Sequence, residues 1–145
     1  MTELDLDRIA WDERGLVPVV VQDIADGAVL MLAYANREAV AATVTTGQAH
    51  FWSRSRQELW RKGATSGNTQ RVLEVRYDCD ADTLLYRVAP AGPACHTGER
   101  SCFYRTLAAL DEAESDFGFE DLFALIQDRK AHPQEGSYTC SLFAD

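Results

Sequence analysis

The sequence predicts a strand-rich domain with two helices, and three observations support this prediction. Two apolar runs rich in β-branched residues flank an Asp-Gly turn at residues 26–27, which is typical of a β-hairpin. Apolar and polar residues alternate along residues 69–77, which is the spacing of a half-buried strand. Helical spacing of apolar residues occurs at 36–47 and 119–130. With 145 residues, 46% of them hydrophobic, the chain can form one compact core.

The first part of the chain is expected to contain a helical turn, the hairpin and a helix. Residues 4–11 suit a short helical turn, and the hairpin strands are expected at 17–22 and 28–34. Asn36 can cap the following helix, and Gly47 can end it. The stripe of this helix that is expected to enter the core consists of Ala39, Val40, Thr43 and Val44.

The second part is expected to contain further strands and a final helix. The expected strands are 49–53, 69–77, 83–89 and a short one at 102–104. Residues 78–82 form a turn between two of these strands, and residues 90–100 form a loop. An amphipathic helix is expected at 119–130, because Phe119, Leu122, Phe123 and Ile126 fall on one face.

Charge and composition restrict the class of protein. The formal net charge is −9, and no segment is apolar enough to span a membrane, so we expect a cytoplasmic protein without a membrane partner. A basic island favours a small anionic ligand over nucleic acid, with a solvated strand surface as the alternative. Its members are Arg54, Arg56, Arg61, Lys62, Arg71 and Arg76. Four cysteines in such a protein favour metal ligands or buried thiols over disulfides.

Metal-capable side chains are concentrated between residues 78 and 105. Thiolates favour a soft metal such as zinc, and carboxylates favour a hard one such as magnesium or calcium. Three thiols without a fourth nearby suit a metal with an open position. The alternative at this point is a set of inert cysteines beside a solvated acidic turn. The side chains concerned are Cys79, Cys95 and Cys102, and Asp78, Asp80 and Asp82.

A second informative stretch, residues 53–68, combines cations, hydroxyl groups and glycines. Glycines allow backbone N–H groups to approach a ligand, and arginine or lysine supplies the charge that a phosphate needs. The stretch lacks the G-K-[ST] ending of a Walker A loop. Residues 53–68 can therefore be interpreted either as a phosphate-binding segment or as an ordinary turn between strands.

Four blocks of the sequence resemble the phosphoribosyl-AMP cyclohydrolase family, over about residues 15–105. They are FWSRSR (51–56), LWRKGATSGN (59–68), DCDADTLL (78–85) and GPACHTGERSCFYR (92–105), in the order of the family. The resemblance implies hydrolysis of the adenine N1–C6 bond of 1-(5-phosphoribosyl)-AMP, the third step of histidine biosynthesis, by a zinc-activated water that attacks C6. It also implies an α+β, β-rich fold in an intertwined homodimer.

The same resemblance implies roles for individual residues. One zinc per subunit is expected on Cys79 of one chain and Cys95 and Cys102 of its partner, and magnesium on Asp78, Asp80 and Asp82. His96 is the candidate general base, with a histidine that only orients the site as the alternative. His50 is expected to be structural. The residues expected to bind the substrate are Arg54, Arg56, Trp60, Lys62, Thr65, Ser66 and Gly67. Trp60 could stack on a base or be an ordinary buried aromatic.

The tail carries a second resemblance. Residues 122–143 (LFALIQDRKAHPQEGSYTCSLF) resemble the opening of phosphoribosyl-ATP pyrophosphohydrolase. This pattern predicts a cyclohydrolase domain at 1–110, an acidic linker at 111–118 and the remnant of a second domain at 119–145. Such a chain is either a bifunctional protein truncated near the start of its second domain or a natural remnant of one. No pyrophosphohydrolase activity is expected, and Cys140 is not expected to be a ligand.

Three other classes of protein were weighed against this assignment. A zinc nucleobase deaminase also attacks a purine at C6, but its H-x-E and P-C-x-x-C motifs are missing from the sequence. A metal-stabilised dimer that binds a nucleotide without turnover would need a fourth ligand such as His96. A plain strand-rich domain does not account for four blocks in family order.

Overall fold

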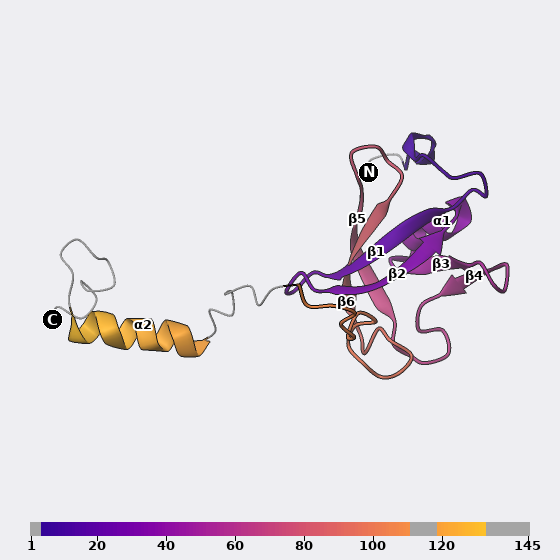
Figure 1. Ribbon diagram of the computed structural model, residues 1–145. Helices are drawn as coiled ribbons and strands as arrows, with labels where there is room; N and C mark the ends of the chain where they lie inside the picture. The colour runs from indigo at the N-terminus through magenta and orange to yellow at the C-terminus, as the bar shows by residue number, and fades with distance from the viewer. Residues whose placement is uncertain (1–3, 111–118, 133–145) are drawn as a thin grey trace. The chain divides into compact units, whose positions relative to one another are not determined.

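The computed structural model of this protein describes residues 4–110 and 119–132, and Figure 1 shows the path of the chain. The chain forms two units, residues 1–105 and residues 106–145, and each is described by itself. The predicted boundaries at 110 and 118 stay a prediction. The predicted linker at 111–118 and the tail beyond residue 132, including Cys140, lie outside the described residues.

Two β-hairpins joined by a parallel pair form the main sheet of the first unit (Figure 1). Strands β1 (Val17–Asp23) and β2 (Val29–Ala35) are antiparallel, as are β5 (Gln70–Tyr77) and β6 (Leu84–Pro90). Strand β1 also pairs in parallel with β6, which gives the order β2-β1-β6-β5. The sheet is therefore mixed, and the unit is a strand-rich α+β structure.

A second, two-stranded sheet lies next to a helix. Strands β3 (His50–Ser53) and β4 (Glu58–Arg61) form a hairpin, and helix α1 (Arg37–Thr46) contacts β2 and β3. The helix begins where the Asn36 side chain accepts a hydrogen bond from the Ala39 N–H, and it ends at Gly47, whose φ of 69° suits glycine. The core between these elements is formed by buried apolar side chains, among them Val19, Val21, Leu30, Val40, Phe51 and Tyr86.

Most of the predicted elements are confirmed. The hairpin around residues 26–27, the capped helix and the strands expected at 49–53, 69–77 and 83–89 all form, with ends displaced by a residue or so. A 3-10 turn, η1, forms at Leu6–Arg8. Helix α2 (Phe119–Ala131) belongs to the second unit. Among the described residues, no helix is long and apolar enough to cross a membrane.

Three expectations about local structure were wrong. The short strand expected at 102–104 does not form; the Cys102 N–H donates to the Leu30 carbonyl, and the chain then continues irregularly. Strand β4 was missed because only two of its four residues are apolar and most of it is exposed. Val44, expected in the core, is 46% exposed, whereas the other three members of its stripe are buried.

Candidate active site

The loop that follows β6 carries two of the three cysteines singled out in the sequence. Within this loop the Ala94 N–H donates to the Arg100 carbonyl at 3.1 Å, and the Cys95 N–H donates to the Glu99 carbonyl at 3.2 Å. These bonds close residues 94–100 into a compact loop, which we call the thiol loop. Cys95 is buried, and Cys102 follows two residues after the loop closes.

The thiols of Cys95 and Cys102 lie close enough to perturb each other's pKa. The pKa of Cys95 is lowered, first by the hydrogen bond from the Thr97 hydroxyl, whose oxygen is 3.0 Å from Sγ, with the positive charge of Lys62 contributing. The pKa of Cys102 is raised, first by desolvation of its thiol and then by Cys95. Cys95 is therefore more acidic than Cys102 and forms a thiolate more readily.

Lys62 is buried beneath the thiol loop. Its exposed fraction is 8%, and its Nζ donates to the Ala94 carbonyl oxygen at 2.6 Å. Gly63 follows with a φ of +83°, and a Cβ there would collide with the backbone nitrogen of Thr69, so only glycine allows the chain to turn at this point. Lys62 was predicted to bind a substrate phosphate, which stays a prediction, and the structure shows its ammonium group in contact with the thiol loop.

A cavity of about 300 Å³ joins the thiol loop to the glycine-rich segment. Cys95 and His96 line one side of it, and Thr65 and Ser66 line the other. Lys62 and Trp60 complete its wall. Five predicted site residues from two blocks of the sequence, together with a predicted metal ligand, are therefore brought together here. Gly67, also predicted, lies in the same segment with a φ of +77° but does not line the cavity.

A second cavity, of about 600 Å³, lies on the turn between β3 and β4. Arg54 and Arg56 line it, and so does Trp60, which is shared with the first cavity. The Arg54 guanidinium carbon stands 3.8 Å from the ring centre of Tyr34, a cation–π contact that fixes the arginine at the cavity wall. Arg54 and Arg56, which were predicted to bind substrate, thus line a different cavity from the one that Cys95 lines. Trp60 lines both cavities.

The three aspartates form a compact cluster at the turn between β5 and β6. Ligand oxygens of Asp78, Asp80 and Asp82 all lie within 4.8 Å of one another, and all three residues are exposed. Hydrogen bonds with the other two carboxyl groups raise the pKa of Asp82, with Asp80 having the larger effect. Mutual repulsion of this kind is relieved by a bound cation, so the cluster fits a hard divalent metal such as magnesium.

Cys79 lies in this aspartate turn and not in the thiol loop. Strand β6 begins next to the turn at Leu84 and ends at Pro90, just before the thiol loop, so the two sites lie at opposite ends of the β5–β6 hairpin (Figure 1). Seven residues of strand span about 20 Å. Among the described residues, the aspartates are the one group of three metal-capable side chains within ligand distance. The donor set of three thiols fits zinc only if Cys79 comes from another copy of the chain.

Several residues of the site were not predicted from the sequence. Thr97 and Tyr34 act through contacts that depend on the fold, and so does Arg100, which forms ion pairs with the turn after β1. His50 is buried, and its Nδ1 lies 2.7 Å from the Gln48 carbonyl oxygen. It does not line either of the two cavities, and the structural role expected for it stays a prediction.

Comparison with known proteins identifies the family of the chain. The sequence profile of the family described as phosphoribosyl-AMP cyclohydrolase matches residues 31–104, more than half of the chain. The chain belongs to the phosphoribosyl-AMP cyclohydrolase family. The phosphoribosyl-AMP cyclohydrolase of Archaeoglobus fulgidus is 63% identical over 99 residues, which are 68% of this chain and 92% of that protein.

Longer relatives of this cyclohydrolase family member are bifunctional. The histidine biosynthesis bifunctional protein HisIE of Thermus thermophilus is 56% identical over 141 residues, and that of Nostoc is 52% identical over 142 residues. These alignments cover 96% and 97% of this chain, but only 64% and 65% of the two relatives. The chain therefore spans a little under two thirds of the length of these bifunctional proteins.

Proposed function

We propose that this chain hydrolyses the adenine N1–C6 bond of 1-(5-phosphoribosyl)-AMP and so opens the purine ring in histidine biosynthesis. The observation that carries the proposal is the position of Trp60, which lines both the cavity of Cys95 and His96 and the cavity of Arg54 and Arg56. The substrate has a purine with a phosphorylated ribose at each end. A reactive centre with a cationic cavity beside it suits a ligand of this shape.

Different residues of the chain would bind the two phosphates and the purine of the substrate. Arg54 and Arg56 would bind one phosphate, and the backbone and hydroxyl groups of Thr65 and Ser66 the other. The Trp60 ring would support the purine between them. This arrangement would place C6 over the thiol loop, where Lys62 contributes positive charge without reaching the phosphates.

The chemistry of the site fits two metals. Zinc on the thiols would supply a water of lowered pKa, which hydrolysis at neutral pH needs. His96, on the cavity wall next to Cys95, would take up the proton released as the water adds. If His96 only orients the site, its removal would lower zinc affinity more than turnover. Magnesium on the aspartates would contribute charge for a phosphate.

We also propose an intertwined homodimer in which Cys79 of one chain completes the thiol set of the other. The separation of Cys79 from Cys95 along the β5–β6 hairpin supports it. Aromatic side chains next to both positions are exposed, namely Tyr77 beside the aspartate turn and Phe103 and Tyr104 after Cys102. Exposed aromatic side chains that flank both halves of a site fit a surface that a second copy covers.

The test is an ultraviolet assay of ring opening with phosphoribosyl-AMP, before and after zinc is removed by a chelator and restored. Activity that disappears with zinc and returns with it is the expected result. A folded, zinc-loaded dimer without ring opening would instead favour the metal-stabilised binding module. Ammonia release from AMP would favour a deaminase. The expected lack of pyrophosphohydrolase activity stays a prediction, which pyrophosphate release from phosphoribosyl-ATP would contradict.

A further inference from the structure

We propose that Arg100 is a positioning residue, which anchors the thiol loop to the turn between β1 and β2 so that Cys95 and Cys102 are held in place before a metal binds. The proposal rests on the proposed function, because it takes these two cysteines as metal ligands. Arg100 lines neither the 300 Å³ cavity nor the 600 Å³ cavity, so its role is separate from substrate binding.

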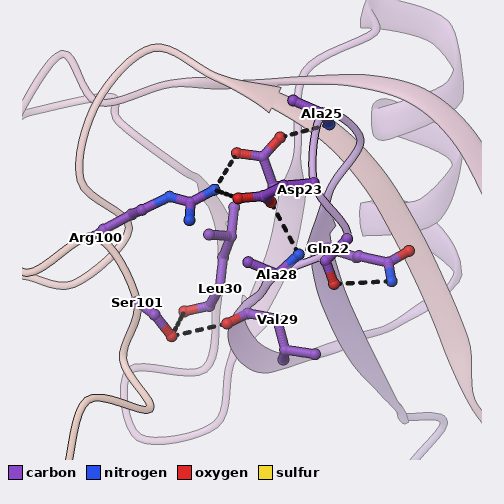
Figure 2. Close-up of polar contacts among 10 residues, drawn as sticks. Gln22, Asp23, Ala25, Ala28, Val29, Leu30, Arg100 and Ser101 are labelled. Atoms are coloured by element: carbon purple, nitrogen blue, oxygen red, sulfur yellow. Dashed lines mark hydrogen bonds and ion pairs between the residues drawn. The ribbon is translucent and has the colours of Figure 1, made fainter. Parts of the chain in front are cut away.

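The anchor is an ion-pair cluster with one buried member. Arg100 Nη2 lies 2.9 Å from Oδ2 of Asp23 (Figure 2). The same nitrogen lies 2.8 Å from Oδ2 of Asp26. The Asp23 side chain is only 9% exposed, and its other carboxylate oxygen accepts a hydrogen bond from the Ala25 N–H at 2.8 Å. A buried carboxylate needs a charged partner, and removal of that partner is costly. Arg100 is therefore held firmly although its own side chain is half exposed.

The next two residues attach to the same hairpin. The Ser101 hydroxyl donates to the Val29 carbonyl at 2.7 Å (Figure 2). The Cys102 N–H donates to the Leu30 carbonyl at 2.8 Å. On the other side, the Arg100 carbonyl accepts from the Ala94 N–H, which closes the thiol loop. Arg100 thus stands between the two cysteines and is fixed through both its side chain and its backbone.

This attachment matters because the thiol loop has no helix or strand of its own. An irregular segment that carries two ligands, Cys95 within the thiol loop and Cys102 just after it, must lose conformational entropy when a metal binds, unless contacts elsewhere have already ordered it. The contacts of Arg100 with Asp23 and Asp26 provide that order, and they do so outside the site itself. Loss of the anchor is expected to weaken metal binding and to expose the buried Cys95 thiol.

The experiment compares the full chain with Arg100→Met and Arg100→Lys, using cobalt(II) as the probe. Thiolate-to-cobalt absorption gives the affinity of the thiol site, and mass spectrometry of alkylated peptides gives the reaction rate of each cysteine in metal-free protein. Arg100→Met is expected to bind cobalt at least tenfold more weakly and to raise the alkylation rate of Cys95 at least tenfold. Arg100→Lys is expected to lie between, because lysine keeps the charge but loses the fork geometry.

Two controls separate positioning from general destabilisation. Arg87→Met removes another partly buried ion pair, 2.8 Å from Glu74, which does not touch the thiol loop, and cobalt affinity is expected to stay within twofold. The alkylation rate of Cys95 in metal-free Arg87→Met should likewise stay within twofold of the original. In a double-mutant cycle, Asp26→Asn should add little to Arg100→Met, because both changes break one interaction.

A folded Arg100→Met chain with cobalt affinity and Cys95 alkylation within twofold of the original would overturn the proposal. If Arg100→Met does not fold, the same comparison is made with Arg100→Lys and with Asp26→Asn, which changes an exposed residue. Unchanged cobalt affinity and unchanged Cys95 alkylation in both variants would overturn the proposal. An original chain without thiolate–cobalt absorption would count against the proposed function. The alkylation rates of Cys95 in the original chain, in Arg100→Met and in Arg87→Met would then decide the role of Arg100 by themselves.

Discussion

The ammonium group of Lys62 donates a 2.6 Å hydrogen bond to the carbonyl oxygen of Ala94, the residue before Cys95. A buried lysine is thereby tied to the thiol loop. The pKa of Cys95 is lowered, first by the hydrogen bond from the Thr97 hydroxyl, and the charge of Lys62 acts in the same direction. The contact joins the glycine-rich segment to the thiol loop.

Lys62→Met is expected to remove most of the ring-opening activity and to destabilise the chain by about 1.5–3 kcal/mol, the contribution of a hydrogen bond that involves a charged group. Urea unfolding and the ultraviolet assay would measure both effects. Arg61→Met is the matched control, because it removes one positive charge from the neighbouring exposed position of β4. Equal losses of activity in the two variants would show that the location of the charge is unimportant.

Arg54→Met is expected to raise KM about 10- to 100-fold with a much smaller effect on kcat, because one charged hydrogen bond to a phosphate contributes about 1.5–3 kcal/mol. The reason is its location in the 600 Å³ cavity, at the far side of Trp60 from the thiols. Arg71→Met on β5 removes the same charge from an exposed strand and should leave KM unchanged. A fall in kcat alone would place Arg54 at the reacting atoms instead.

Asp82→Asn is expected to have opposite effects on metal binding and on the metal-free chain. Its neighbours Asp80 and Asp78 raise the pKa of Asp82, so neutralising it relieves repulsion and should raise Tm in the absence of metal. Calorimetric titration should show magnesium affinity at least tenfold weaker, since one carboxylate ligand is lost. Glu13→Gln, an exposed acid outside the aspartate turn, should change neither quantity.

Subunit mixing tests whether two chains share one thiol set. Cys79→Ser and Cys102→Ser are each expected to be inactive alone. Coexpressed in equal amounts, they should recover about a quarter of the original activity, because half of the dimers are mixed and each contains one intact site. Recovery of no activity, from dimers shown to be mixed, would mean that each chain supplies its own three thiols.

The buried hydroxyl of Tyr86 is expected to make the folded chain less stable at alkaline pH. Burial raises the pKa of Tyr86 to about 12, and the neighbouring Thr43 hydroxyl offsets only part of that increase. Above its ordinary pKa of 10.0 the unfolded chain releases this proton while the folded chain retains it, so stability is fully present below pH 10 and falls between pH 10 and 12.

Tyr86→Phe should remove this fall. Relative to the original chain, its free energy of unfolding should gain about 2–3 kcal/mol between pH 9 and pH 12, from two pKa units at about 1.4 kcal/mol each. Urea unfolding across this range measures the difference, and the common titration of lysines cancels in the comparison. Parallel curves for the two proteins would mean that the Tyr86 hydroxyl reaches solvent in the folded state.

Local signals in the sequence predicted the elements that depend on neighbours along the chain. Asn36 and Gly47 fix the ends of α1 through their own side-chain and backbone chemistry, and the Asp26-Gly27 turn fixes the first hairpin. The parallel pairing of β1 with β6 has no such signal, because it depends on how two distant hairpins pack. For the same reason the strand expected after Ser101 was wrong, since Cys102 instead donates to Leu30.

In the candidate site, too, local sequence predicts some features and the fold alone determines others. Residue chemistry identified the thiols, the aspartates and the cations of the glycine-rich segment, which the structure gathers around two cavities and one turn. The separation of Cys79 from Cys95 was expected from the resemblance to the family, and the course of the β5–β6 hairpin explains it physically. The ion pair between Arg100 and Asp23 could not be predicted from the sequence. Arginines and acidic residues are common along the chain, and only the fold determines which of them meet.

The ion pair between Arg100 and Asp23 joins residues 77 positions apart in the chain. During synthesis, Asp23 leaves the ribosome long before its partner, and the parallel pairing of β1 also waits for β6. The first hairpin can form early, but the thiol loop can be secured only when almost the whole unit has emerged. Contacts of such long sequence separation slow folding. Newly made chains therefore pass through a period in which Cys95 is open to oxidation and to the wrong metal.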